Sequence, residues 1–210
     1  AQSGSILLSS GSSASGVGGD IVVAAGGSTS QTGGSISFRS GDSDSAVSGS
    51  LSLSTGTTYA SASSGSISIK TGDAEDGNVG NVRIATGDTV GEAAGSISFV
   101  AGTSQSAIAS HLRFIAGDTA GDGSNGGDFS VVAGSGISNG GSVNVNAGSG
   151  QTLTGGGIRL NSGSSDAGAS GHISISTSGT PGSAISGALL LQSGNSEEFT
   201  GAINIQTGAS

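Results

Sequence analysis

The stretch Gly34-Ser-Ile-Ser-Phe-Arg-Ser-Gly41 decides the fold, because variants of this phrase return about every fifteen residues along the whole chain. It places two large apolar residues, Ile36 and Phe38, two positions apart between glycines. Alternation with a period of two is typical of an extended strand with one buried face. A fixed period of this kind indicates a repeat architecture.

Counting from the residue before each expected strand gives fourteen repeats, each with two apolar positions. The first apolar column holds Ile6, Ile21, Ile36, Leu51, Ile67, Val82, Ile97, Leu112, Phe129, Val143, Ile158, Ile173, Leu189 and Ile203. The second holds Leu8, Val23, Phe38, Leu53, Ile69, Ile84, Phe99, Phe114, Val131, Val145, Leu160, Ile175, Leu191 and Ile205. Such an unbroken register argues against the disordered low-complexity chain that 43 glycines suggest.

A small residue and then a glycine almost always follow each apolar pair, as at Ser10, Ala25 and Ser40. This pattern suits a crowded corner at which the backbone must turn, and glycine permits a positive φ where the turn needs one. Helix is disfavoured as a dominant element, because glycine is frequent and no 3.6-residue period is sustained.

These features predict an all-β fold, a parallel β-solenoid (β-helix) of fourteen repeats of ~15 residues. Each repeat could form a full turn, or two repeats could share a coil of ~30 residues. Arg39-Ser-Gly-Asp42 is most similar to Lys70-Thr-Gly-Asp73, two repeats on, whereas the repeat between them has Ser54 at this position. Two opposed strands also resemble a normal two-sheet core. We therefore expect two strands per coil.

One solenoid domain is expected over residues 1–210, with no evident caps and with loop insertions near 118–126 and at Pro181. Because the chain opens at Ala1 without methionine, we expect a processed protein or an excerpt of a longer one. The terminal strands would expose the apolar pairs Ile6 with Leu8 and Ile203 with Ile205. Since open strand edges recruit partners, these residues are predicted self-assembly edges, covered head to tail by other copies or by flanking repeats.

The formal net charge of −9, with five basic residues, disfavours binding to nucleic acid or anionic membranes. No apolar run approaches the length of a membrane span, so no membrane insertion is expected. The absence of cysteine excludes disulfides and thiolate metal sites. This acidic, thiol-free composition, rich in Ser, Thr and Gly, favours an extracellular or cell-surface location.

Acidic residues cluster in the expected loops, and a solenoid would stack them on its edges. Stacked carboxylates repel one another unless a cation or a basic side chain lies nearby. One set is therefore a weak Ca²⁺ candidate, and it consists of Asp42, Asp44, Asp73, Glu75 and Asp76. A second set is Asp88, Glu92, Asp118 and Asp122. In the alternative interpretation basic neighbours such as Arg39 and Lys70 offset the charge. The calcium-roll signature Gly-Gly-x-Gly-x-Asp is absent, and we expect no metal and no cofactor.

The sequence predicts no enzyme. His111 and His172 lie at outward positions without matched ligand partners. No Gly-x-Ser-x-Gly elbow has the required strand–turn–helix context, and the glycine-rich segments lack the lysine and helix of a phosphate loop.

A column of hydroxyl residues two positions after the corner glycines suggests ice binding, which needs a flat lattice of Thr or Ser. Its members include Ser13, Ser28, Ser43, Thr58, Thr89, Thr119, Ser165 and Ser196. In the alternative interpretation these hydroxyls satisfy backbone groups of their own turns.

The recurring Gly-Ser-Ile-Ser-x-x-Ser-Gly phrase resembles the Gly/Ser-rich repeat proteins of microalgal and protist cell surfaces. That resemblance implies an extracellular coat, wall or hair-like structure and assigns no functional residues. We therefore expect an extracellular structural protein that forms or decorates a filament or surface coat. The alternatives are an ice-binding protein and, third, a calcium-stabilised adhesin stalk.

Overall fold

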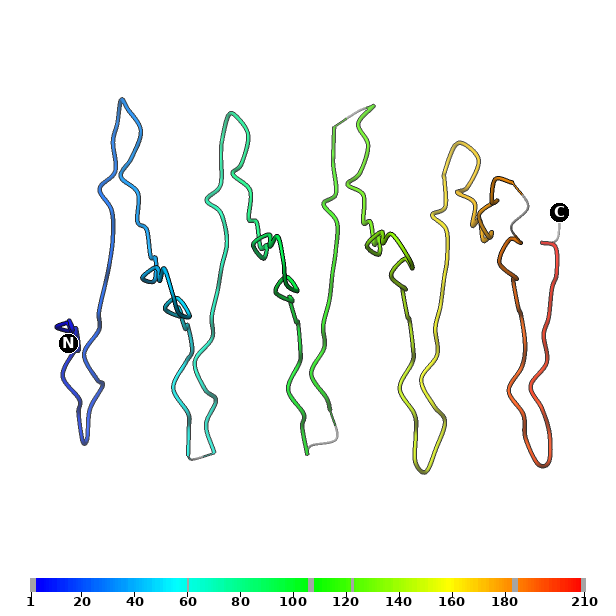
Figure 1. Ribbon diagram of the computed structural model, residues 1–210, viewed down its shortest axis with the longest axis horizontal. Helices are drawn as coiled ribbons and strands as arrows, with labels where there is room; N and C mark the ends of the chain where they lie inside the picture. Colours follow the sequence, from blue (N-terminus) through cyan, green and yellow to red (C-terminus); the bar gives the residue numbers. More distant parts are fainter. Residues whose placement is uncertain (1–2, 60, 106–107, 122, 183–184, 209–210) are drawn as a thin grey trace. The chain divides into compact units, whose positions relative to one another are not determined.

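The computed structural model describes residues 3–59, 61–105, 108–121, 123–182 and 185–208. Within these ranges there is no helix and no β-strand, only extended segments, bends and turns. The chain divides into two units, Ala1–Val100 and Ala101–Ser210, and each is described by itself. In both units extended segments alternate with loops along the chain (Figure 1).

The expectation of an all-β parallel β-solenoid is therefore wrong. A strand is defined by a ladder of backbone hydrogen bonds to a neighbouring segment. The backbone–backbone bonds between described residues join positions at most ten apart, the longest from the Gly127 N–H to the Gly117 C=O. No such bond links one repeat to a later turn of the chain, so the extended segments lack the pairing that would make them strands.

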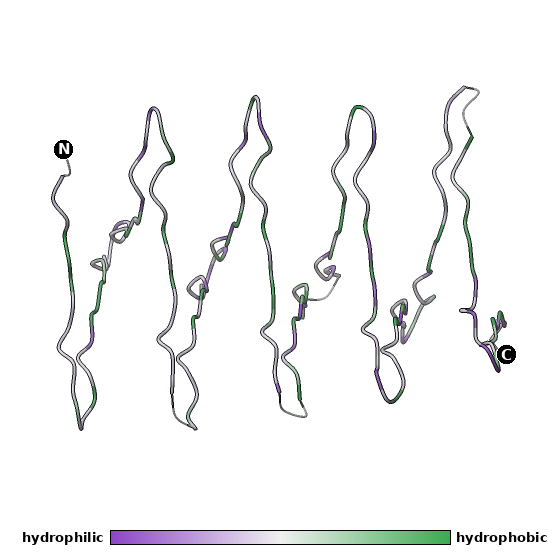
Figure 2. Ribbon diagram, turned by 60° about the horizontal axis from the view of Figure 1, so that its bottom comes forward, coloured by the Kyte–Doolittle hydropathy of each residue, from purple (hydrophilic) through white to green (hydrophobic). Residues whose placement is uncertain are grey.

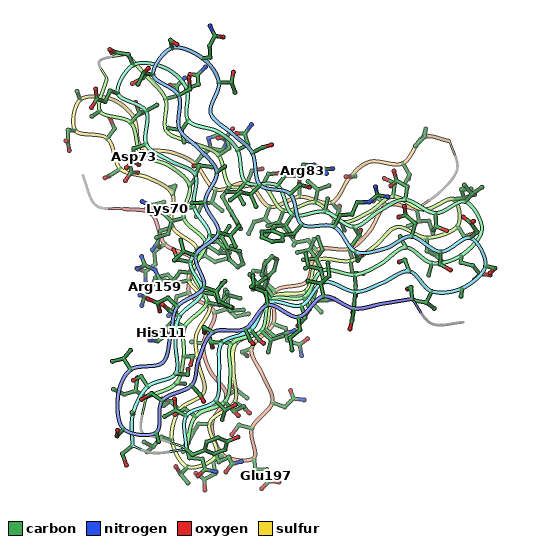
Figure 3. All side chains as sticks on the ribbon, turned by 90° about the vertical axis from the view of Figure 1, so that its left-hand side faces the viewer. Lys70, Asp73, Arg83, His111, Arg159 and Glu197 are labelled. Carbon is green, nitrogen blue, oxygen red and sulfur yellow. The ribbon has the colours of Figure 1, made fainter. Side chains whose placement is uncertain are left out.

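The coil of two strands and ~30 residues is wrong as well. Seen end-on, each unit has three lobes around a centre in which side chains gather (Figure 3). In the second unit His111 and Arg159 belong to repeats three apart and lie on the same side. In the first unit Lys70 and Arg83 belong to consecutive repeats and lie on different sides. Each unit therefore winds with three repeats per turn.

The loops leave the coil and return at almost the same point. The Gly19 N–H donates to the Gly11 C=O at 2.9 Å, which closes the loop between them. The same closure recurs at Gly34 to Gly26, Gly49 to Gly41, Gly127 to Gly117, Gly141 to Gly134, Gly156 to Gly148 and Gly171 to Gly163. We call this junction the loop neck. Because the neck is narrow, each loop projects outward as a lobe and the next extended segment continues the coil.

The apolar columns face the centre of each unit, as the alternating pattern predicts. Ile36 is 48% exposed and Ile97 is 47% exposed, whereas Leu7, at an outward position of its segment, is 87% exposed. Figure 2 shows green stretches along the extended segments and much of the purple near the loops. Even so, no described residue is buried. The columns are therefore oriented toward one another without being packed into a core.

Candidate functional site

The loop necks are closely packed. A Cβ on Gly34 would lie 3.2 Å from the Ala25 Cβ and 3.4 Å from the backbone N of Gly26. Gly19 and Gly49 are similarly crowded, against Ser10 and Ser40 respectively. At these necks the crowding explains why a small residue precedes the corner glycine.

None of the described corner glycines has a positive φ. Among the described residues, positive φ values occur at Gly77, Gly123 and Gly182, which all lie within loops. The corner glycines Gly11, Gly26 and Gly41 have open space where a Cβ would be. The glycine that the neck requires is the one that begins the next segment, where the two arms of the loop approach each other.

The hydroxyl column lies inside the loops and bonds their backbone. The Gly16 N–H donates to Ser13 Oγ at 2.8 Å, the Gln31 N–H to Ser28 Oγ at 2.9 Å and the Ala46 N–H to Ser43 Oγ at 3.0 Å. In the second unit the Gly168 N–H donates to Ser165 Oγ at 2.9 Å. The interpretation that these hydroxyls satisfy turn backbone groups is confirmed at these four positions.

The acidic candidates are not brought together. Among the described residues no group of three His, Cys, Asp or Glu side chains is arranged to hold a metal ion. Asp42 Oδ2 instead contacts Arg39 Nη2 within the same repeat. Both side chains of this ion pair are exposed, and such pairs contribute about 0–1 kcal/mol. The candidate Asp122 of the second acidic set lies outside the described residues.

The described chain has no cleft in which a small molecule could be enclosed, and no pocket is found in it. His111 and Arg159 share one side of the second unit, and Glu197 lies out on one of its lobes (Figure 3). In the first unit Asp73 lies on a lobe, beyond Lys70. The charged side chains are thus dispersed over the lobes and the outer sides. No described helix is long and apolar enough to cross a membrane.

The predicted self-assembly edges are exposed. Ile6 is fully exposed and Ile205 is 89% exposed. Leu8 and Ile203 are exposed as well, but members of the same columns in the middle repeats are also about half exposed. The terminal residues therefore belong to an apolar surface that runs through every repeat. Sequence reasoning missed this larger surface, because it assigned the middle repeats to a closed core.

The extended segments carry the apolar surface that runs through each unit. Their apolar columns are incompletely covered, and no described residue pairs their backbone in a ladder. The chain exposes 20892 Å² of accessible surface. A folded monomer of 19.4 kDa exposes about 8500 Å² and an extended chain of that mass about 28000 Å². The isolated chain thus lies far closer to the extended limit than to a folded monomer.

Comparisons with known proteins found no matching family model, no matching curated protein and no matching solved structure.

Proposed function

We propose that the protein is a structural component of an extracellular filament or surface coat, and that it works by assembling with other copies of itself. The observation that carries this proposal is the accessible surface of 20892 Å², which is about two and a half times that of a folded monomer of this mass. This surface includes the side chains of both apolar columns, and large exposed apolar surface is a feature of chains that complete their fold in an assembly.

The chemistry of the surface supports a structural role. The described residues enclose no pocket and assemble no metal-ligating group, and the charged side chains lie dispersed on lobes. The thiol-free, Ser/Thr/Gly-rich sequence with its net charge of −9 suits an extracellular setting. The apolar pairs at the terminal repeats, Ile6 with Leu8 and Ile203 with Ile205, would join copies or flanking repeats head to tail.

Ice binding is the weaker candidate. The hydroxyl column that suggested it is engaged with the backbone of its own loops, at Ser13, Ser28, Ser43 and Ser165. A hydroxyl that accepts a hydrogen bond within a bend is held by the loop and does not form part of a flat lattice.

Electron microscopy of the purified chain over a range of concentrations tests the proposal. We expect elongated assemblies that lengthen or become more numerous as the concentration rises. Isolated monomers at every concentration would refute it. Measurement of thermal hysteresis on the same samples tests the alternative, for which we expect no activity.

A further inference from the structure

We propose that three copies of the chain interwind unit by unit, and that within each unit the extended segments of each copy lie between successive turns of the same unit of the others. This inference rests on the proposed self-assembly and specifies its contact surface. In it, the copies contact one another along the whole length of each unit, rather than only at the terminal repeats.

The first argument is the direction in which the incompletely covered apolar columns face. The apolar columns point toward the centre of each unit, and the loops radiate outward as lobes (Figure 3). A partner that approached from outside would meet the lobes and would leave the columns uncovered. A partner that winds around the same axis reaches both the columns and the backbone of the extended segments.

The second argument is that the copies are complementary to one another. Buried backbone N–H and C=O groups must be paired, and extended segments pair most readily with other extended segments. Because all fourteen repeats carry both apolar columns without interruption, any repeat can lie against any other with its apolar residues matched. A folded chain of this mass would expose about 12000 Å² less than the isolated chain does, so a large surface is available for contact between copies.

The three repeats per turn determine the arrangement. A second copy, rotated about the axis by one third of a turn, places its repeat n+1 beside repeat n of the first copy. A third copy, rotated once more, places repeat n+2 next, and repeat n+3 of the first copy follows. Three rotations return to the starting orientation, so a set of three copies is closed by symmetry.

The spacing of charges favours this register over one that stacks identical repeats. Like charges directly opposite each other are destabilising. In the second unit the acidic loops 117–127, 163–171 and 194–201 are separated by the loops 134–141, 148–156 and 179–187, which carry no acid. A shift of one repeat therefore places each acidic loop beside a neutral one, whereas an unshifted register stacks each on itself. In the first unit the pair 72–80 and 87–95 is the exception, since both loops are acidic.

A shift of one repeat also keeps the arginine side chains of different copies apart. Arg83, Arg113 and Arg159 occupy the third position of their repeats, and Ser98, Ser130, Asn144 and Ser174 occupy it in the repeats that follow or intervene. With a shift of one repeat no two of these arginines become neighbours. An unshifted register would stack Arg83 on Arg83 and Arg113 on Arg113.

Site-directed cross-linking tests the contact, because the chain has no cysteine of its own. Single-cysteine variants Ser130→Cys and Asn144→Cys are each prepared, unfolded, mixed, refolded together and oxidised with glutathione disulfide. Neighbouring extended segments lie about 4.8 Å apart, which is within the Cα separation that a disulfide spans. Any Ser130→Cys to Asn144→Cys bond must join two chains, and peptide mass spectrometry distinguishes it from bonds between identical variants.

The matched control mixes Ser130→Cys with Ser174→Cys, which lies three repeats away. We expect the bond between the one-repeat pair to exceed the control by about tenfold or more, as an effective concentration in the millimolar range implies. Analytical ultracentrifugation of the unmodified chain should give three times 19.4 kDa, or whole multiples of that mass. A dominant bond between identical Ser130→Cys chains would overturn the one-repeat register. A particle of two chains would overturn the closed set of three.

A further mixture separates this inference from the proposed function. Leu7→Cys and Asn204→Cys lie in the first and last repeats and report head-to-tail contact. If this pair forms the only bond, the interwound arrangement fails and end-to-end assembly stands. If no pair forms and the chain sediments at 19.4 kDa, both fail.

Discussion

Phe114 and Phe129 stack with ring centroids 6.2 Å apart and ring planes inclined by 28°. They belong to consecutive repeats and are separated by the loop that closes when the Gly127 N–H donates to the Gly117 C=O at 2.9 Å. The loop neck thus brings the second apolar residue of one repeat against the first apolar residue of the next. Contact between consecutive repeats at the centre of the coil follows from closure of the loop.

This stacked pair should be energetically coupled. We expect a double-mutant cycle with Phe114→Leu and Phe129→Leu to give a coupling free energy of about 0.5–1.5 kcal/mol, which is typical of aromatic pairs. The measurement is denaturant unfolding at a fixed protomer concentration. A cycle that pairs Phe129→Leu with Phe199→Leu is the control, because Phe199 lies in the distant loop 194–201. Coupling of equal size in both cycles would contradict the prediction.

Alanine substitutions at the two glycines of one loop neck should have different effects on stability. Gly34→Ala would bring a Cβ to 3.2 Å from the Ala25 Cβ, so the neck must open. We expect a loss of about 1–3 kcal/mol in the free energy of unfolding, as for other overpacked sites. Gly26→Ala meets nothing within 4 Å and should be neutral or stabilising by up to about 1 kcal/mol. Equal effects of both substitutions on the denaturation midpoint would show that the neck is not tightly packed.

The alternation of residues was enough to predict the two apolar columns and the side on which they lie. The pairing of the segments could not be predicted in the same way. The two-residue period predicts that Ile36 and Phe38 face an apolar environment. It does not predict whether that environment comes from the same chain or from another copy. The apparent two-repeat similarity of Arg39-Ser-Gly-Asp42 and Lys70-Thr-Gly-Asp73 was therefore no guide to the coil.

The loop closure could have been found from the sequence. The neck glycines recur at a spacing of eight residues in the loops 11–19, 26–34 and 41–49, with a small residue before the first. The small residue and the glycine after it predict a corner, but they do not by themselves predict that the loop closes on itself. The second glycine of each pair is needed because the arms of the loop approach within hydrogen-bonding distance, at 2.8–2.9 Å, whereas the first has open space where a Cβ would be.

The hydroxyl column should contribute to loop order. Ser13→Ala removes the acceptor of the Gly16 N–H, so we expect faster hydrogen exchange at this amide and a loss of about 0.5–1.5 kcal/mol. Ser12→Ala is the control, because the Ser12 hydroxyl bonds none of the described residues. Exchange at the Gly16 amide that is unchanged in Ser13→Ala would show that the hydroxyl does not hold the bend.

Calcium should have little effect on stability. Asp42 contacts Arg39, and the described acidic residues form no metal-ligating group. Because a ligand specific to the assembled state raises its stability, a bound structural ion would be revealed by a chelator. We expect the same melting temperature with EDTA and with millimolar Ca²⁺. A rise with Ca²⁺ that is abolished by replacing Asp73, Glu75 and Asp76 with their amides would contradict this prediction.

Salt should strengthen assembly. Each copy carries a formal net charge of −9, so bringing copies together concentrates like charge, and screening by salt lowers that repulsion. We expect the concentration at which half of the chains are assembled to fall as sodium chloride rises from ~10 mM to ~150 mM, over which the Debye length shrinks from about 30 Å to about 8 Å. Light scattering over a dilution series measures this concentration.

A charge variant controls for general effects of salt. The double substitution Glu197→Gln with Glu198→Gln removes two negative charges from one loop, so it should lower the half-assembly concentration at ~10 mM salt and have a smaller effect at ~150 mM. Ser196→Ala, in the same loop, leaves the charge unchanged and is the matched variant. Assembly that weakens with salt would mean that attraction between opposite charges dominates the contact, and the apolar columns would then no longer account for association.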